Sequence, residues 1–413
     1  MKLDKSFEYL SRAEKVIPVC SQTFSKGYRY FPKGVSPIFL SCGQGSHTWD
    51  VDGNEYVDYI CGLGPITLGY NYYRVNQAII DQLLGGIIYS LPHPLEVELA
   101  ELLVDIIPSA EMVRFFKTGS EACQAAIRVA RAYTGRDGIA FRGYHGWHDW
   151  YAVHTERNRG IPRPILSYIY EFEYNDIKSL EQLLKSGMIA AVIMEPVIVE
   201  PPKDGFLQQV KELTHQYGAI LIFDEVVTGF RWALGGAQEY FGVIPDLAVF
   251  GKGLGNGMPI NAVVGRRDIM LEFEEVMVSS TFGGECLSLV AGLATIQEMR
   301  DKKTIDHCWK LGTELMAGLM DIGIEVQGYP CRPAITQAFS LEEKALFLQE
   351  IIRRGILIHS GFLINFCYSH TDEDIDRTIE ACGEAMDIVR KTVSSGNWDV
   401  LEGELIIPAF KRL

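Results

Sequence analysis

The sequence predicts an α/β fold, built on a mostly parallel sheet with helices on both faces, together with a second, smaller α+β domain. Three observations carry this prediction. Apolar, strand-like runs alternate with helical patterns through the middle of the chain. The runs are almost continuously apolar, as in strands that are buried on both faces. After about residue 320 the pattern changes to short strands and one long closing helix.

Length, charge and cysteine usage narrow the class of protein. The chain has 413 residues, 47% of them hydrophobic, which is enough for two domains. Its 38 Lys and Arg against 53 Asp and Glu give a net charge of −15 without a basic stripe, so we expect no nucleic-acid partner. The nine cysteines include no C-x-x-C pair and predict core thiols and no metal site. Without a signal-peptide pattern or a long apolar segment, we expect a cytoplasmic protein with no membrane partner.

The first element is a β-hairpin over residues 47–60. Its sequence alternates around Asp52-Gly53, a dipeptide that suits a tight turn. We expect residues 1–60 to form an N-terminal arm and hairpin that pack with the small domain. The large domain is then expected over residues 61–320, and the C-terminal small domain over 321–413.

The large domain begins with a helix from about residue 95, a strand at 113–116 and a helix over 120–133. Further strands are predicted at 138–142, 190–194, 219–223, 247–250 and 262–264. A helical stripe lies between the second and third of these, at Phe206, Val210, Leu213 and Tyr217. In the small domain we predict strands at 334–339 and 355–358 and a closing helix whose apolar stripe runs from Ile375 to Val393.

Two strand ends carry charged residues. The strand 219–223 runs into Asp224, and the strand 247–250 runs into Gly251-Lys252-Gly253. Either residue alone is better explained as a helix cap or as a lysine that reaches water. Together, a carboxylate beside a lysine flanked by glycines predicts a lysine that forms a Schiff base with a carbonyl group.

Two further segments carry residues that could bind a phosphate group and an aromatic ring. Gly119 and Ser120 lie between a strand and a helix, where bare amides and a hydroxyl can bind phosphate. Tyr144 follows the strand 138–142 and offers a ring for stacking, although core packing is the commoner fate of an aromatic residue. A phosphate cup, a carboxylate and a Schiff-base lysine are the parts needed to bind pyridoxal 5′-phosphate (PLP).

Six motifs in this order resemble the class III, fold-type I PLP-dependent aminotransferases. They are G-S-E-A (119–122), Y-H-G-W (144–147), E-P (195–196), D-E-V-x-T-G-F-R (224–231), G-K-G-L-G-N-G-M-P (251–259) and S-T-F-G-G (280–284). Within that class the sequence is most similar to glutamate-1-semialdehyde aminomutase and its aminotransferase relatives, and the likeness spans nearly the whole chain.

The resemblance implies roles for the central residues. Lys252 would hold PLP as a Schiff base and move the proton, and Asp224 would bond the pyridinium nitrogen. Val226 and Tyr144 would cover the two faces of the ring.

The remaining roles concern the phosphate and the subunit partner. Gly119 and Ser120 would bind the phosphate, whereas Thr281 would reach the phosphate of the other subunit's cofactor, which makes a homodimer with shared active sites. Glu195 and Arg29 are candidates near the substrate, although a surface arginine is an equally good explanation of Arg29.

Departures from the family bear on the substrate. The aminomutases carry a tryptophan in their substrate gate where this chain has Gly62-Leu63-Gly64-Pro65, and the family's usual Asn-Pro is Glu285-Cys286 here. Leu63, Phe362 and Ile364 predict an apolar pocket wall. We therefore expect an aminotransferase that acts on an amino donor and acceptor with a bulky or apolar part and passes through pyridoxamine phosphate.

Other functions stay open at this point. The first alternative is an intramolecular aminomutase, and a PLP racemase or decarboxylase is another. A nucleotide-binding protein is disfavoured because the glycines at 251–257 do not form a phosphate-binding G-x-x-x-x-G-K-[ST] loop. An inactive subunit of the same fold would have no need for Lys252, Asp224 and Ser120 together.

Overall fold

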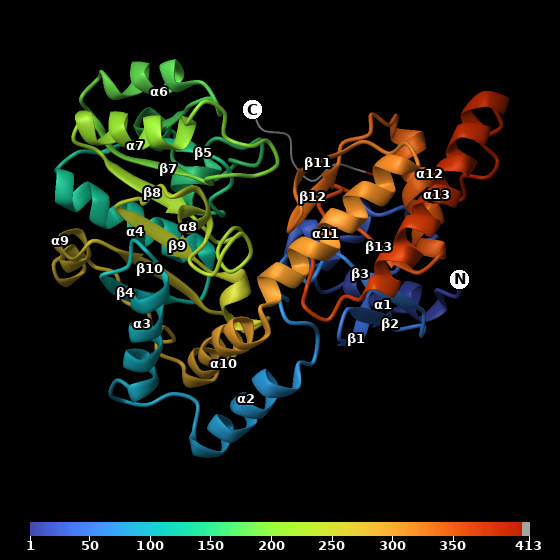
Figure 1. The fold of residues 1–413 in the computed structure, drawn as a ribbon, viewed down its shortest axis with the longest axis horizontal. Helices are drawn as coiled ribbons and strands as arrows, with labels where there is room; N and C mark the ends of the chain where they lie inside the picture. Colours follow the sequence, from blue (N-terminus) through green and yellow to red (C-terminus); the bar gives the residue numbers. More distant parts are fainter. Residues whose placement is uncertain (407–413) are drawn as a thin grey trace. The chain divides into compact units, whose positions relative to one another are not determined.

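The computed structural model describes residues 1–406, which form two compact units (Figure 1). Among the described residues, the terminal unit consists of Met1–Tyr72 and residues 306–406, and the central unit is Tyr73–Ile305. The second boundary lies earlier than the expected residue 320 because leucines of α11 (Thr304–Asp321) belong to the terminal unit's core. The first boundary, after Tyr72, lies later than the expected residue 60 because Cys61 and Ile66 pack with Cys367 of the terminal unit.

The central unit contains the predicted, mostly parallel sheet. Its strands are β4 (Met112–Phe116), β5 (Gly138–Arg142), β6 (Ile169–Glu171), β7 (Ile189–Met194), β8 (Ile220–Asp224), β9 (Leu247–Phe250) and β10 (Asn261–Gly265). Their order in the seven-stranded sheet is β4-β10-β9-β8-β7-β5-β6. All neighbouring pairs are parallel except those of β10, which runs antiparallel to β4 and to β9. The prediction included every strand but β6, a three-residue edge strand.

Helices cover both faces of this sheet (Figure 1). Successive side chains of a strand point to opposite faces, so Ile139 and Phe141 of β5 pack on one face with α4 (Gly119–Thr134). Ala140 packs on the other, with α6 (Ile177–Leu184) and α7 (Phe206–Gln216). Burial on both faces explains why the strands read as continuous apolar runs.

The other helices of the central unit lie around this three-layered core. The long ones are α2 (Tyr73–Gly85), α3 (Pro94–Ile106) and α10 (Cys286–Lys302), and α10 packs against both α2 and α3. The short ones are α5 (Asp149–Ala152), α8 (Ala237–Phe241) and α9 (Arg267–Met270).

The terminal unit joins the two ends of the chain in one sheet. Its strands β1 (Leu40–Gln44), β2 (His47–Asp50), β3 (Glu55–Asp58) and β13 (Ile356–Leu357) are arranged in that order. The predicted hairpin is present: β2 pairs antiparallel with β3, and Gly53 takes a φ of +91° in the turn. The C-terminal strand β13 is parallel to β3.

Within residues 1–406, the terminal unit also contains a second small sheet and four α-helices. The strands β11 (Val326–Tyr329) and β12 (Arg332–Ile335) pair antiparallel, so the strand expected at 334–339 starts and ends earlier. The helices are α1 (Asp4–Ala13), α11, α12 (Leu341–Arg353) and α13 (Asp372–Ser395). Their apolar faces enclose a core that includes Tyr59, Leu311, Phe347 and Cys382.

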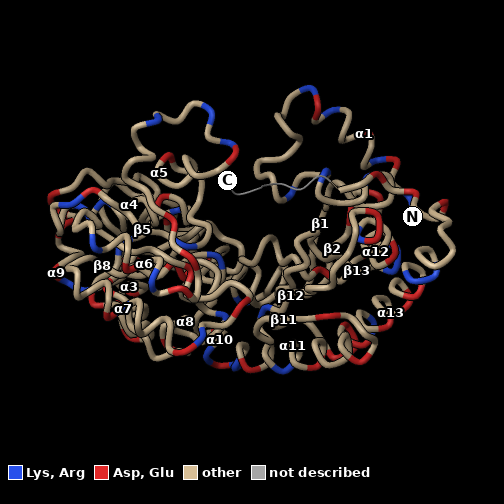
Figure 2. Tube along the Cα trace, turned by 90° about the horizontal axis from the view of Figure 1, so that it is seen from above, with Lys and Arg blue, Asp and Glu red and all other residues tan. Residues whose placement is uncertain are grey.

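Charged residues of both signs are interspersed along the chain (Figure 2). Within residues 1–406, no helix is both long and apolar enough to cross a membrane.

Candidate active site

Polar residues and glycines gather at one edge of the central sheet, where the parallel strands end. The strands β4, β5, β7, β8 and β9 all end at this edge, and β10 begins there, since Asn261 pairs with Phe116 and Ala262 with Phe250. Ligands of open α/β sheets bind at such an edge. The segments that follow these strands are 117–120, 143–147, 195, 224–226 and 251–253.

Asp224, at the end of β8, is a buried carboxylate held by three donors. Its Oδ1 accepts the backbone N–H of Val226 at 3.1 Å. Its Oδ2 lies 2.7 Å from His145 Nδ1 and accepts the thiol of Cys123 at 3.4 Å. The residue is only 4% exposed. Since a carboxylate offers about four acceptor positions, one remains for a further donor.

His145 orients this carboxylate from the turn after β5. Its Nδ1 faces Asp224, and its Nε2 lies 3.2 Å from the carbonyl oxygen of Arg142. A carboxylate oxygen accepts hydrogen bonds, so a hydrogen on Nδ1 makes His145 the donor in the contact with Asp224. The ring is 1% exposed and stacks on Trp150 at a centroid distance of 5.8 Å.

Cys123, His145 and Asp224 also belong to residue types that bind metals, and their ligand atoms lie within 4.8 Å of one another. Burial and the charge of Asp224 raise the pKa of the Cys123 thiol. The thiol therefore stays protonated and donates to Asp224, whereas a metal ligand would be a thiolate.

Lys252 follows β9 in a strained turn. It begins a short 3₁₀ helix, Lys252–Gly255, with a φ of 41°, a value that is uncommon for a residue with a side chain. The glycine before it is required by packing, because a Cβ on Gly251 would lie 1.9 Å from Oδ1 of Asn261. Register places Val249 beside Asp224, so the lysine leaves the sheet next to the strand that ends in the carboxylate.

Asn261 joins the lysine strand to the phosphate-cup segment. Its Nδ2 donates to the carbonyl oxygen of Lys117 at 2.9 Å. Its Oδ1 is buried and has no hydrogen-bond partner among residues 1–406. A Cβ on Gly119 would lie 3.6 Å from the same oxygen and 3.3 Å from Val226. Gly251 therefore leaves room for the side chain of Asn261, and Gly119 leaves room for that of Val226. A residue with a Cβ at either position would crowd these side chains.

The predicted phosphate cup is the start of α4. Thr118 is the N-cap and accepts the N–H of Glu121, and Glu121 accepts the N–H of Thr118 in return. Glu121 also accepts the N–H of Lys117, so the helix start is rigid. Ser120 accepts the N–H of Trp147 at 3.3 Å, which brings the turn after β5 to the cup.

Tyr144 and Glu195 meet at the next two strand ends. Oε1 of Glu195 accepts the backbone N–H of Tyr144 at 2.7 Å. Glu195 is 8% exposed, whereas the ring of Tyr144 is 52% exposed, which leaves the ring available to another molecule. Burial and the negative charge of Asp224 raise the pKa of the Tyr144 hydroxyl. Glu195 therefore fixes the turn that carries Tyr144.

Two other predicted residues lie elsewhere. Thr281 is exposed in the turn before α10, and none of the hydrogen bonds described above involves it. Arg29 belongs to the terminal unit, where it is exposed and its Nε donates to the Tyr28 hydroxyl at 3.4 Å.

Two of the three residues expected to line an apolar pocket lie in the terminal unit's core. Ile364 is fully buried and Phe362 is 5% exposed, and both are members of the terminal unit's core. An apolar residue in a short irregular segment can face either a core or a pocket. The sequence therefore could not show that Phe362 and Ile364 belong to the core. Leu63 is half-buried.

Sequence reasoning missed Cys123, His145 and Asn261. His145 had a local signal, because it follows Tyr144 in the Y-H-G-W motif. Cys123 looked like any apolar helix residue, and Asn261 like the polar start of a strand. Their contacts with Asp224 and Lys117 span 101 and 144 residues of the chain and become visible only in the fold.

Comparisons with known proteins agree with this arrangement. A family model described as aminotransferase class-III matches residues 30–379. The chain is 38% identical to a 3-aminobutyryl-CoA aminotransferase of Cloacimonas acidaminovorans, over 95% of this chain and 99% of that protein. It is 36% identical to a glutamate-1-semialdehyde 2,1-aminomutase of Desulforamulus reducens, over 92% of this chain and 97% of that protein.

A solved structure extends the likeness to three dimensions. The PLP internal aldimine form of the FumI protein of Sphingopyxis sp. MTA144 superposes with a TM-score of 0.89 at 29% identity, covering 94% of this chain and 97% of that one. The expected fold-type I architecture and the resemblance stated above are confirmed. This chain belongs to the class-III aminotransferase family, whose members are PLP-dependent enzymes that move amino groups.

Proposed function

We propose that this protein transfers an amino group between two small molecules at the edge of the central sheet, with Lys252 and Asp224 as its catalytic residues. The observation that carries the proposal is the pair of adjacent strand ends, β8 with a buried carboxylate and β9 with a lysine in a strained turn. A mere helix cap would not need the carboxylate to be buried among three donors.

The residues at this edge fit PLP. Asp224 has one acceptor position left for a ring N–H, and the amides at the start of α4 suit a phosphate. Gly119 lets Val226 approach the cup, and the exposed ring of Tyr144 can cover an aromatic ring. When bound, PLP supplies a carbonyl carbon for amines and a ring that accepts electron density.

The chain's own residues then supply orientation and proton transfer. His145, Cys123 and the N–H of Val226 hold the Asp224 carboxylate in one orientation, so that it stabilises positive charge on a ring nitrogen in front of it. Lys252 Nζ holds and moves the proton, since one positioned amine can act as both acid and base. Glu195 keeps the turn of Tyr144 in place.

We propose a substrate with a bulky or apolar part, for which a 3-aminoacyl thioester is the first candidate. The name and 38% identity of the Cloacimonas relative support this choice, as does the gate segment Gly62–Pro65, which lacks the tryptophan of the aminomutases. An intramolecular aminomutase is the second candidate, because the Desulforamulus relative is nearly as similar.

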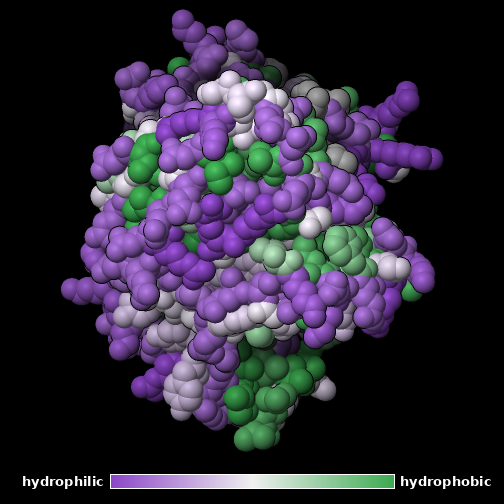
Figure 3. All heavy atoms as spheres, turned by 90° about the vertical axis from the view of Figure 1, so that its right-hand side faces the viewer, coloured by the Kyte–Doolittle hydropathy of each residue, from purple (hydrophilic) through white to green (hydrophobic). Residues whose placement is uncertain are grey.

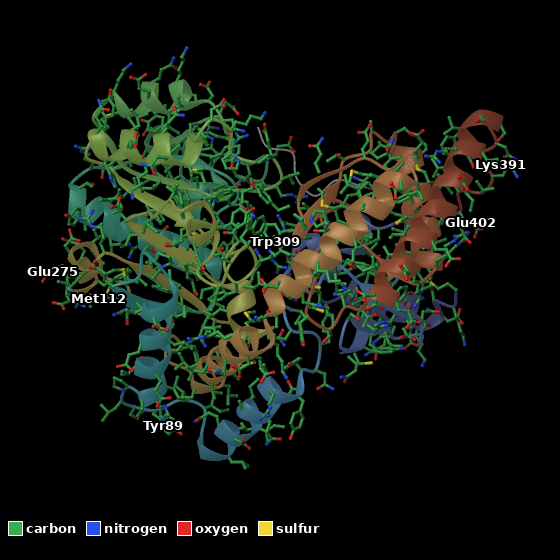
Figure 4. All side chains as sticks on the ribbon, in the orientation of Figure 1. Tyr89, Met112, Glu275, Trp309, Lys391 and Glu402 are labelled. Carbon is green, nitrogen blue, oxygen red and sulfur yellow. The ribbon has the colours of Figure 1, made fainter. Side chains whose placement is uncertain are left out.

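A homodimer with shared active sites is part of the proposal. Thr281 is exposed, as a residue that serves a second subunit must be. Large apolar side chains are also exposed on α2 and the segment after it, at Tyr73, Ile80, Leu83, Leu84, Ile87, Ile88, Tyr89 and Leu91. Figure 3 shows hydrophobic residues gathered at the lower end of the molecule, at the height of α2 in Figure 1, and Figure 4 labels Tyr89. Such a patch on one chain is typical of an interface.

Reduction with borohydride tests the lysine assignment. The wild-type protein mixed with PLP should gain one pyridoxyl group, on the peptide that contains Lys252, and Lys252→Ala should gain none there. Lys310→Ala, which removes an exposed lysine paired with Asp372, is the matched control. A pyridoxyl group on another lysine of the wild-type protein would contradict the assignment.

A panel of amines separates the two candidate reactions. A transaminase given an amine alone converts its cofactor to pyridoxamine phosphate. It needs a separate oxo acid or aldehyde to convert the cofactor back to PLP. If the cofactor rapidly regains its PLP form without an added acceptor, and an isomerised amino compound is released, the enzyme is an aminomutase. Fastest conversion with glutamate and aspartate would contradict the proposed substrate class.

A further inference from the structure

Two thiols of the terminal unit meet in its interior, in a cluster that the proposed reaction does not use. Cys61 and Cys367 are fully buried, and beside them His370 is 1% exposed. The two sulfur atoms and a ring nitrogen of His370 all lie within 4.8 Å of one another. Cys61 and Cys367 come from opposite ends of the chain and pack together with Ile66.

Cys367 has the surroundings of a reactive thiol. Its Sγ lies 3.2 Å from Nδ1 of His370. Burial raises the pKa of this thiol, but the hydrogen bond from Cys61 and the nearby His370 outweigh burial, so its pKa falls below the ordinary value. Thiolate character is what makes a cysteine nucleophilic.

Cys61 lies in a turn whose backbone is strained. Four consecutive residues have positive φ: 49° at Cys61, 67° at Gly62, 79° at Leu63 and 96° at Gly64. Two of them carry side chains, for which such values are costly. Gly62 and Leu63 of this turn are partly buried, and local opening of the strained backbone there gives a small oxidant access to the thiols.

We propose that Cys61 and Cys367 form a reversible disulfide when the protein meets a peroxide. The Cys367 thiolate attacks one peroxide oxygen, so that an S–O bond forms, the O–O bond breaks, and the released hydroxide takes a proton to become water. The Cys61 sulfur then attacks the Cys367 sulfur, the S–S bond forms, and the S–O bond breaks. The departing oxygen leaves as a second water with the proton of Cys61. Two thiols are oxidised, one peroxide is reduced, and a dithiol reverses the change.

A bound metal ion is the competing explanation, and the geometry favours the disulfide. The cluster offers three ligand atoms, the two sulfur atoms and a ring nitrogen of His370, whereas a structural zinc takes four. The nearby carboxylate of Asp58 accepts N–H groups of Ile60 and Cys61 and the hydroxyl of Tyr70. Among residues 1–406, the cluster therefore lacks the fourth ligand that a structural zinc requires.

The test uses the full-length wild-type protein with hydrogen peroxide. After alkylation of the remaining thiols and digestion without reductant, mass spectrometry should find the peptides of Cys61 and Cys367 joined, with two of the nine thiols lost. Dithiothreitol should restore both. Oxidation confined to other thiols, such as the exposed Cys42, would overturn the proposal.

Variants and metal analysis sharpen the result. Cys61→Ser should abolish the joined peptide and leave Cys367 as a sulfenic acid that dimedone traps. Cys382→Ser, at a fully buried cysteine in the core of the same unit, should leave the joined peptide unchanged. One zinc per purified chain that is lost in Cys367→Ser would overturn the proposal in favour of a metal site. If a variant does not fold, the wild-type experiment still decides.

Discussion

At the scale of single residues, the candidate site depends on one buried charge and the groups that orient it. Asp224 is 4% exposed, and an isolated carboxylate at that depth would be unfavourable. The hydrogen bonds from His145, Cys123 and Val226 compensate for its burial. His145 is a positioning residue in this arrangement, because it acts through Asp224.

We expect His145→Phe to lower the rate of amine conversion by about 10- to 100-fold, since a hydrogen bond to a charged group contributes about 1.5–3 kcal/mol. Phenylalanine keeps the packing against Trp150 but removes the ring nitrogen that faces Asp224. The pH dependence of the visible absorbance of the PLP-loaded protein should also shift, and a purely structural role of His145 would not cause such a shift. His154→Phe is the control, because His154 contacts a carbonyl oxygen and the ring of Phe141 but no carboxylate. Equal rates in both variants would contradict the role of His145.

At the scale of secondary-structure elements, two glycines inside helices differ in whether the surrounding packing leaves room for a side chain. Gly312 lies in α11, where a Cβ would be 1.8 Å from the carbonyl oxygen of Pro330. Gly383 lies in α13, where a Cβ would meet only Ile322, at 3.7 Å. The first glycine permits a close contact between backbones, and the second lowers helix propensity without such a reason.

Gly383→Ala should therefore stabilise the protein by about 0.5–1 kcal/mol. Gly312→Ala should destabilise it by about 1–3 kcal/mol, because the backbone at Pro330 must move. Urea unfolding of both variants measures the difference. A Gly312→Ala protein as stable as the wild type would contradict the close approach.

A histidine joins the N-terminal hairpin to the last helix. His47 of β2 lies 2.8 Å from Glu55 and 3.0 Å from Asp374 of α13. The hydrogen bond with Asp374 raises the pKa of His47, although burial opposes it. Burial would raise the pKa of Asp374, but its bonds with His47 and Ser46 lower it to about 2.

These pKa shifts predict how stability depends on pH. The raised pKa of His47 adds stability that is complete below about pH 6.5, the unfolded value, and is lost as the pH rises through the folded value. The lowered pKa of Asp374 adds stability that is present above about pH 4 and is lost as the pH falls toward 2. His47→Gln should thus lose on the order of 1 kcal/mol at pH 5.5 and much less at pH 8.5.

Urea unfolding at the two pH values tests this prediction. His307→Gln is the control, because His307 contacts the carbonyl oxygen of His370 and, among residues 1–406, no carboxylate. An equal loss of stability at both pH values in His47→Gln would show that the histidine contributes by packing alone.

At the scale of the whole molecule, the exposed apolar side chains of α2 and residues 87–91 form the surface that we propose as the dimer interface. Leu84 is 86% and Leu91 79% exposed, values that are costly for leucine in water. We expect the double variant Leu84→Asp, Leu91→Asp to be monomeric at concentrations where the wild type is a dimer, as measured by sedimentation. Val16→Asp, at an exposed valine of the terminal unit, should remain dimeric.

Mixed subunits test whether the active sites are shared. Lys252→Ala and Thr281→Ala chains are each expected to be inactive, but a mixed dimer contains one site with both residues intact. Mixing should restore activity toward one quarter of the wild-type value per site, from random pairing. A fully active wild-type monomer would contradict the shared site.

The sequence by itself determined the α/β class, nearly all strands of the central sheet, the hairpin at Gly53 and the polar residues at the strand ends. These follow from local properties: side-chain alternation, apolar runs buried on both faces, and turn chemistry. Tertiary structure alone decided the antiparallel direction of β10, since the short apolar run of residues 262–264 reads the same in either direction. It also decided the partners that lie far apart in the chain, His145 with Asp224, Asn261 with Lys117 and Cys61 with Cys367. Contacts of that kind leave no periodicity in the sequence, because they depend on which strands become neighbours once the sheet has formed.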